Sequence, residues 1–180
     1  MTVRFSGLGG QGVVVSGVIF GHAAMFEGFD VLQSQSYGST TRGGVTTSDV
    51  TLEHGPIHEL ECPEVNVLVA LCQEALDRFL PLLAPGGLLV TESSLVEVES
   101  ASVEPYRHIS LPAFDTARKQ LGRQILANIV TLGALSTVVE EVSPRSLERA
   151  ILAHVPPGTE ALNRQAFELG RELVEPRAMP

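Results

Sequence analysis

Glycine occupies four of the seven positions from Ser6 to Gly12, in the stretch "SGLGGQG". Val3–Ser6 before it predicts a strand, and the run "GVVVSGVIFGHAAMFEG" after it predicts a helix that is apolar almost all round and ended by Gly28. Glycines between a first strand and a first helix let the backbone approach a neighbouring group closely, often a phosphate. This cluster therefore constrains both the fold and the site.

Strand-like and helix-like segments alternate along the rest of the chain. We expect strands at 29–34, 45–52, 65–72, 88–93 and 106–112, and helices at 73–87, 113–122, 123–141, from Ser143 and Pro144 onward, and 159–173. The apolar run 65–72 suits a central strand, whereas 45–52 suits a position toward an edge. The alternation predicts one α/β domain over residues 1–180, with three α/β/α layers around a mostly parallel or mixed sheet.

The bulk composition excludes several classes of protein. The chain has 180 residues, 44% of them hydrophobic, and a formal charge of −9 from 21 acidic and 12 basic residues. This acidic balance disfavours nucleic acid, whose phosphates are held by clustered Lys and Arg. Because no stretch approaches about 18 apolar residues and no signal-peptide pattern opens the chain, we expect a cytoplasmic protein without a membrane partner.

Catalytic and metal-binding patterns are not evident in the sequence. Cys62 and Cys72 are the only cysteines, so the chain cannot supply the four thiolates of an iron–sulfur cluster. The five histidines are scattered without a Ser-His-acid or H-E-x-x-H arrangement. We expect Cys72 to be a buried structural thiol and His22 to be a packing residue. The expectation is that this chain alone carries no catalytic residue and no metal site.

The glycine cluster satisfies the G-x-G-x-x-G spacing of dinucleotide-binding folds. The second expected strand ends "LQSQS" with no acid to hold a ribose, and Asp30 lies at its beginning, so an NAD-dependent oxidoreductase is the least favoured hypothesis. Two interpretations of the loop stay open: phosphate binding at the helix N-terminus, or glycines that permit only a tight turn. The candidate anion contacts are Gly7, Gly9, Gly10, Gln11 and Gly12.

A second polar loop, from Ser34 to Asp49, follows the second expected strand. It should leave the sheet at the same edge as the glycine loop, because open α/β sheets place their ligands at the carboxyl ends of strands. One arginine flanked by glycines can present its guanidinium to an anion. A solvated surface loop is the alternative. Its candidate contacts are Tyr37, Gly38, Arg42, Gly43 and Gly44.

Five short blocks occur in order between Gly7 and Gly170: "GLGGQG", "SYGSTTRGG", "LPAFDTARKQLG", "NIVTLGAL" and "NRQAFELG". Together they resemble the gamma subunit, or gamma domain, of the 2-oxoacid:ferredoxin oxidoreductases, which act on pyruvate, 2-oxoglutarate, 2-ketoisovalerate or indolepyruvate. Two details depart from that family's pattern: "STT" stands where Pro-Glu-Ser is common before Arg42, and "LECPEVN" stands where an acid usually opens the central strand.

The resemblance implies an accessory subunit in oxidative decarboxylation of a 2-oxoacid to an acyl-coenzyme A. It places thiamine diphosphate, Mg²⁺ and iron–sulfur clusters on alpha, beta and ferredoxin-like delta subunits, with ferredoxin as electron acceptor. The resemblance also implies that the glycine loops of this chain help to bind coenzyme A. Without partners, the apolar surfaces of the helices at 12–28 and 123–141 should make the chain self-associate. The alternative hypothesis is a free-standing, self-associating module that binds a nucleotide or phosphate.

Overall fold

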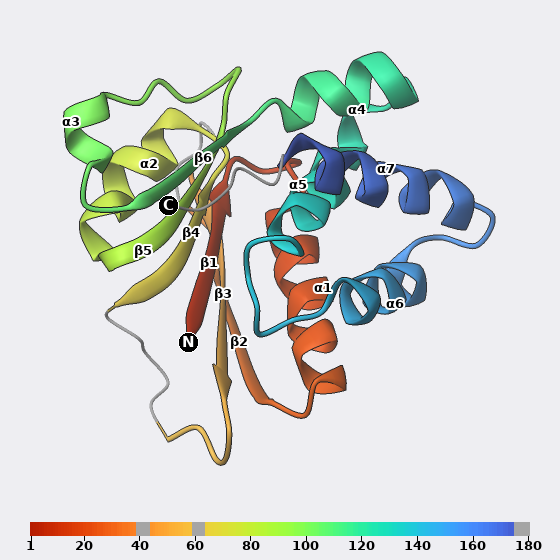
Figure 1. Ribbon diagram of the computed structural model, residues 1–180, viewed down its shortest axis with the longest axis horizontal. Helices are drawn as coiled ribbons and strands as arrows, with labels where there is room; N and C mark the ends of the chain where they lie inside the picture. Colours follow the sequence, from red (N-terminus) through yellow and green to blue (C-terminus); the bar gives the residue numbers. More distant parts are fainter. Residues whose placement is uncertain (39–43, 59–63, 175–180) are drawn as a thin grey trace.

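The computed structural model describes residues 1–38, 44–58 and 64–174 and is built around one sheet of six strands (Figure 1). The strands lie in the order β2-β3-β1-β4-β5-β6. β3 runs antiparallel to both β2 and β1, whereas β4, β5 and β6 continue parallel to β1. The sheet is therefore mixed. The strands are β1 Thr2–Gly7, β2 Asp30–Ser36, β3 Thr46–Glu53, β4 Val65–Ala70, β5 Leu83–Glu92 and β6 Arg107–Leu111.

The segment 45–52 lies toward an edge of the sheet, as predicted, but it does not form the edge, because β3 lies between β2 and β1. Its hydroxyl side chains are buried, and those of Ser48 and Thr51 have hydrogen-bond partners on the neighbouring strands. Gln33 Nε2 donates to Ser48 Oγ at 2.9 Å, and the hydroxyls of Thr2 and Thr51 lie 3.2 Å apart. Since these partners satisfy the hydroxyl groups, burial costs little. The more exposed β2 forms the edge, while β4 is central as predicted.

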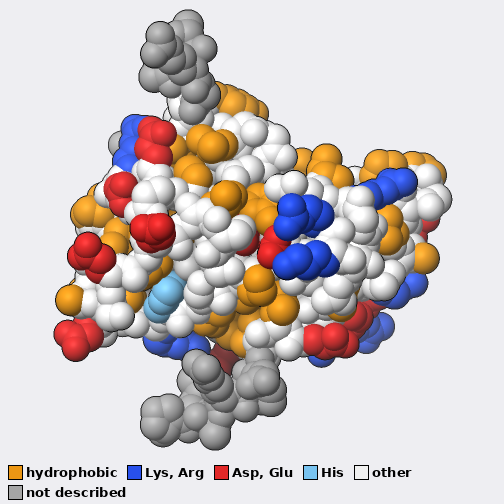
Figure 2. Space-filling view, turned by 90° about the horizontal axis from the view of Figure 1, so that it is seen from above, with side chains coloured by type: hydrophobic (Ala, Val, Ile, Leu, Met, Phe, Trp, Pro, Cys, Tyr) orange, Lys and Arg blue, Asp and Glu red, His pale blue; other side chains and the backbone are white. Residues whose placement is uncertain are grey.

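Helices cover both faces of the sheet, which confirms the three-layer prediction (Figure 1). α1, α4, α5, α6 and α7 pack on one face, and α2 and α3 on the other. On the surface viewed in Figure 2, apolar side chains reach the solvent among charged ones of both signs. The α-helices are α1 Val13–Phe26, α2 Gln73–Phe79, α3 Ser100–Val103, α4 Ala113–Leu121, α5 Ala127–Leu135, α6 Pro144–His154 and α7 Glu160–Leu173.

Two helices are shorter than the sequence predicted. The segment 73–87 leaves the α-helix after Phe79, passes through the 3₁₀ turn η1 (Leu80–Leu82) and becomes β5. The segment 123–141 begins as the 3₁₀ turn η2 (Gln124–Leu126), and α5 ends at Leu135. At that end Ser136 Oγ donates to the Gly133 carbonyl at 2.7 Å and Thr137 Oγ1 to Ala134 at 2.8 Å. Such local bonds compete with continuation of the helix.

α5 does not expose the apolar surface that the sequence suggested, because every residue in it is buried. α7 packs closely on α5 where Gly133 faces the Phe167 carbonyl and Gly170 faces the Val130 carbonyl. α1 differs from α5, since Val15 is 48% exposed and Met25 is 58% exposed. Among the described residues, no helix has the length and apolar character needed to cross a membrane.

Candidate functional site

The glycine loop, residues 8–12, joins the end of β1 to the start of α1. Gly10 and Gly12 adopt φ angles of 87° and 75°, which side chains rarely tolerate. The first intrahelical bond runs from Ser16 N to Gly12 O at 2.8 Å, and no side chain caps the helix. The backbone N–H groups of residues 13–15 thus have no acceptor within the described part of the chain. Unpaired donors at the positive end of a helix dipole favour an anion.

Gln11 shapes this loop through its side-chain amide. Its Oε1 accepts the Leu8 N–H at 2.6 Å, and its Nε2 donates to the Leu71 carbonyl at 3.1 Å. A Cβ on Gly7 would overlap Gln11 Oε1, so glycine is needed there for the amide to reach Leu71. The predicted candidate Gln11 therefore uses its amide to tie the loop to the end of β4.

The second polar loop leaves the sheet beside the first, as the sequence predicted. In the β1–β3 pair Gly7 lies opposite Thr46, and in the β2–β3 pair Ser36 lies opposite Thr47. A Cβ on Gly38 would come within 2.6 Å of the Gly44 backbone, so the two stems of the loop touch. The predicted contacts Arg42 and Gly43 lie outside the described residues.

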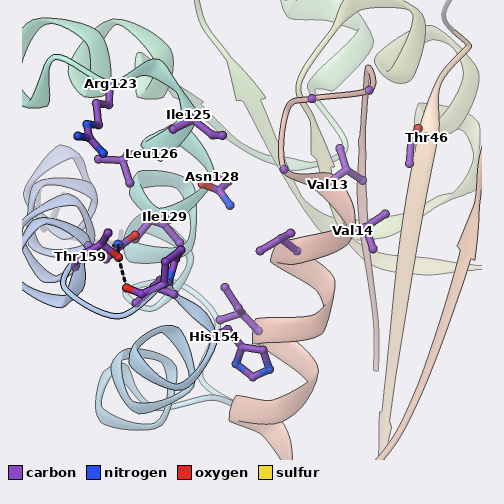
Figure 3. Close-up of a pocket in the computed structure, with 18 of the residues that line it drawn as sticks. Val13, Val14, Thr46, Arg123, Ile125, Leu126, Asn128, Ile129, His154 and Thr159 are labelled. Atoms are coloured by element: carbon purple, nitrogen blue, oxygen red, sulfur yellow. Dashed lines mark hydrogen bonds between the residues drawn. The ribbon is translucent and has the colours of Figure 1, made fainter.

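A cavity of about 590 Å³ opens in front of the glycine loop. Gly9, Gly10, Gly12 and the first turn of α1 form one wall, and the opposite wall comes from η2, α5 and the link between α6 and α7 (Figure 3). Tyr37, which is 64% exposed, stands at the rim with Thr46. This size is typical of small-molecule pockets. The cavity thus joins both predicted loops to helices that the sequence analysis did not assign to the site.

Most of the cavity wall is apolar, and few polar groups interrupt it. Among the described residues that line the cavity, Arg123 is the only Lys, Arg, Asp or Glu. The Asn163 amide is engaged, because its Nδ2 donates to Thr159 Oγ1 at 3.0 Å. Asn128 extends from α5 toward the glycine loop (Figure 3), where a Cβ added to Gly12 would lie 2.8 Å from Asn128 Nδ2. A wall that carries positive but no carboxylate charge favours an anionic ligand.

The remaining candidate groups give little evidence of chemistry. Cys72 is buried at the end of β4, and this burial raises the pKa of its thiol, as expected for a structural cysteine. His22 is exposed on α1, and its ring lies edge-on to that of His154 with the centroids 4.4 Å apart, so it is not a core residue. Among the described residues, no three His, Cys, Asp or Glu side chains lie together as metal ligands would.

The chain matches the family described as pyruvate ferredoxin/flavodoxin oxidoreductase over residues 2–173. It is 38% identical to the 2-oxoglutarate synthase subunit KorC of Methanothermobacter thermautotrophicus, over 96% of this chain and 94% of KorC. The gamma subunit of keto/oxoacid ferredoxin oxidoreductase from Geobacter sulfurreducens is similar in structure, with a TM-score of 0.83, 39% identity and coverage of 95% of this chain and 96% of that one.

A longer chain shares the same fold at lower identity. It belongs to 2-oxoglutarate:ferredoxin oxidoreductase from Magnetococcus marinus, solved with 2-oxoglutarate, coenzyme A and succinyl-CoA bound. The match has a TM-score of 0.83 and 23% identity, and it covers 96% of this chain and 30% of the longer one. In that protein the shared fold is thus one part of a larger polypeptide.

Proposed function

Because this chain belongs to the pyruvate ferredoxin/flavodoxin oxidoreductase family, we propose that it is the gamma subunit of a thiamine-diphosphate-dependent 2-oxoacid:ferredoxin oxidoreductase. The near-complete coverage of KorC and of the Geobacter gamma subunit supports a role for residues 1–180 as one gamma-type domain. The similarity to KorC favours 2-oxoglutarate as the substrate of the assembled enzyme.

In this proposal the decarboxylation and electron-transfer centres belong to partner subunits. Thiamine diphosphate with Mg²⁺ supplies the carbanion chemistry of 2-oxoacid cleavage, and iron–sulfur clusters pass the electrons to ferredoxin. The two cysteines of this chain are too few to ligate a four-cysteine cluster. The alpha and beta subunits, and a ferredoxin-like delta subunit, are therefore the proposed partners, and the cytoplasm is the proposed location.

The contribution of this chain is the binding of coenzyme A. The observation that carries this proposal is the row of unpaired N–H groups at residues 13–15, which opens onto a cavity wall bearing Arg123 and no described carboxylate. The phosphate groups of a diphosphate are among the anions that such donors bind. The glycine loop and its neighbour supply the proposed contacts: Gly7, Gly9, Gly10, Gly12, Tyr37, Gly38, Arg42, Gly43 and Gly44, with Gln11 holding the loop in shape.

Substitution of Gly9 tests the proposal, because a Cβ there meets no atom within 4 Å and its φ is not in the left-handed range. Gly9→Asp adds a carboxylate to the loop, and Gly9→Ala is the matched control without charge. With this chain co-expressed with the proposed alpha, beta and delta subunits, we expect Gly9→Asp to raise the KM for coenzyme A about tenfold, or about 1.4 kcal/mol, and to leave co-elution and thiamine-dependent decarboxylation unchanged.

Three results would oppose this assignment. Equal KM values for coenzyme A in wild type, Gly9→Asp and Gly9→Ala would show that the loop does not bind coenzyme A. Loss of co-elution in Gly9→Asp would make the loop a docking surface. Failure of the wild-type chain to co-elute with any thiamine-binding subunit would favour the free-standing phosphate-binding module instead.

A further inference from the structure

β2 forms one edge of the sheet and lacks the features that usually keep an edge strand from pairing. Within the described part of the chain it pairs with β3 alone, and no backbone–backbone hydrogen bond outside that ladder involves residues 30–36. Its seven residues include no proline, lysine or arginine, and its register with β3 runs without a bulge from Asp30 to Ser36. Short strands, lysine, proline and bulges are what block edge-to-edge pairing. β2 is therefore open to a further strand.

The opposite edge of the sheet, β6, is protected in these ways. It has five residues, begins with Arg107 and lies between Pro105 and Pro112 in the chain. A short strand with a charged residue and flanking prolines pairs poorly with a second strand. Of the two edges, β2 thus offers the longer and less protected ladder.

α1 presents an exposed apolar side next to the same edge. A Cβ on Gly21 would lie 3.2 Å from Val31 Cγ1, so one side of α1 packs on β2 (Figure 1). Another side meets α6, where the rings of His22 and His154 lie 4.4 Å apart. Met25 points between these two sides at helical spacing, and it is 58% exposed. The exposed side of α1 therefore borders β2.

The residues of β2 are complementary to themselves in an antiparallel pair. A two-fold axis at Gln33 sets all seven residues of one copy opposite the seven of a second copy. Asp30 is the only charged residue of the strand, and this register keeps the two Asp30 carboxylates at opposite ends of the ribbon. Like charges directly opposite each other destabilise a strand pair, and this register contains none. The pairs are Asp30 with Ser36, Val31 with Gln35, Leu32 with Ser34, and Gln33 with itself.

We propose that two copies of this chain pair through β2, so that their sheets join into one continuous sheet. A two-fold axis perpendicular to the sheet reverses the strand direction but keeps each face on its own side. The two α1 helices therefore lie on the same face, and their exposed sides with Met25 face each other. The backbone ladder and the burial of apolar surface on α1 both favour association. This dimer does not depend on the enzyme assignment, because every observation behind it lies within the fold of the chain.

Charge changes at the two ends of β2 test the pairing. Ser36→Asp sets a carboxylate opposite Asp30 at both ends of the ribbon, and we expect it to raise the dimer dissociation constant of the full chain about tenfold in sedimentation equilibrium. Adding Asp30→Lys to Ser36→Asp sets opposite charges across the pair and should return the dissociation constant to the wild-type value or below. Lysine suits this position, because Glu53 lies opposite it on β3. Ser100→Asp adds the same charge at an exposed position on α3 and should dimerise as wild type does.

Wild type should sediment with twice the chain mass of 19.2 kDa. A monomeric wild type, or a dissociation constant that Ser36→Asp leaves unchanged, would overturn the pairing through β2. A dimer that Met25→Glu dissociates and Ser36→Asp does not would place the whole interface on α1 and refute the pairing. Failure of the double variant to recover would also refute it, because Asp30 and Ser36 would then not face each other.

Co-expression with the proposed partner subunits distinguishes a second copy from another occupant of the edge. If Ser36→Asp dimerised as wild type does but no longer co-eluted with the thiamine-binding subunit, β2 would pair with that subunit and the proposal would be refuted. If Ser36→Asp weakened the dimer and still co-eluted, the pairing of two copies would stand.

Discussion

Arg4 on β1 and Asp49 on β3 stand directly opposite each other and share two hydrogen bonds, Nε to Oδ1 at 2.7 Å and Nη2 to Oδ2 at 2.6 Å. Their side chains are 12% and 22% exposed, and the Arg4 guanidinium lies 4.8 Å from the centre of the Phe79 ring. The same register sets Gly7 opposite Thr46. This pair therefore helps to align the strands that bring the two loops of the site together.

Arg4→Ala should lower the free energy of unfolding by about 1.5–3 kcal/mol, because it leaves a mostly buried carboxylate without its charged partner. Urea denaturation measures this loss. Arg118→Ala removes an exposed arginine paired with Asp115 and is expected to change stability by no more than about 0.5 kcal/mol. A loss for Arg4→Ala as small as that of the control would show that the pair does not stabilise the sheet.

Gly133→Ala and Gly170→Ala should each destabilise the fold by about 1–3 kcal/mol, because the new methyl groups overlap backbone carbonyls across the α5–α7 contact. Backbone atoms cannot move aside as a flexible side chain can. Gly9→Ala is the matched control, since its Cβ meets open space. Thermal or urea unfolding of the three variants measures this loss. If Gly133→Ala and Gly170→Ala were as stable as wild type, the close packing of α5 on α7 would be contradicted.

The stability of the fold should depend on the protonation of His108, whose Nε2 lies 2.9 Å from Thr91 Oγ1. Burial lowers the pKa of His108 below its ordinary value of 6.5, so the unfolded chain binds the proton more readily than the folded one. The free energy of unfolding should therefore fall as the pH drops from above 6.5 toward the folded-state pKa of His108.

Urea titrations of wild type and His108→Gln between about pH 8 and pH 5 test this dependence. The variant lacks the titrating group, so the stability advantage of wild type over the variant should shrink as the pH falls. His58→Gln, at an exposed position, controls for the loss of an imidazole. If the stability advantage of wild type over His108→Gln grew as the pH fell, the pKa of His108 would be raised by folding and not lowered.

The chain without its partners should self-associate through α1. Val15, Val18, His22 and Met25 follow one another at helical spacing along the solvent side of α1, and Val15 and Met25 are about half exposed. Light scattering should give a mass above 19.2 kDa at high concentration, and Met25→Glu should shift it toward the monomer. A monomeric mass for wild type would contradict this prediction.

The sequence by itself determined the features that depend on a few neighbouring residues. Apolar runs that alternate between strand and helix spacing predicted the three layers, and Ser143 before Pro144 predicted the start of α6, where Ser143 Oγ accepts the Ser146 N–H at 3.2 Å. Five short blocks also predicted the family, which the match over residues 2–173 confirms. These signals are readable because backbone geometry and capping are set locally.

Only the tertiary structure decided which residues meet across the fold. The place of β3 inside the sheet depends on hydroxyl partners contributed by β1 and β2. The side-chain amide of Gln11 donates to the Leu71 carbonyl at the end of β4. Asn128, which is far from Gly12 in the sequence, packs against Gly12 at the cavity wall. Such contacts depend on how the helices pack over the sheet, and no spacing within a local segment encodes them. A glycine loop is therefore readable in the sequence, whereas the cavity that it faces is a property of the packed core.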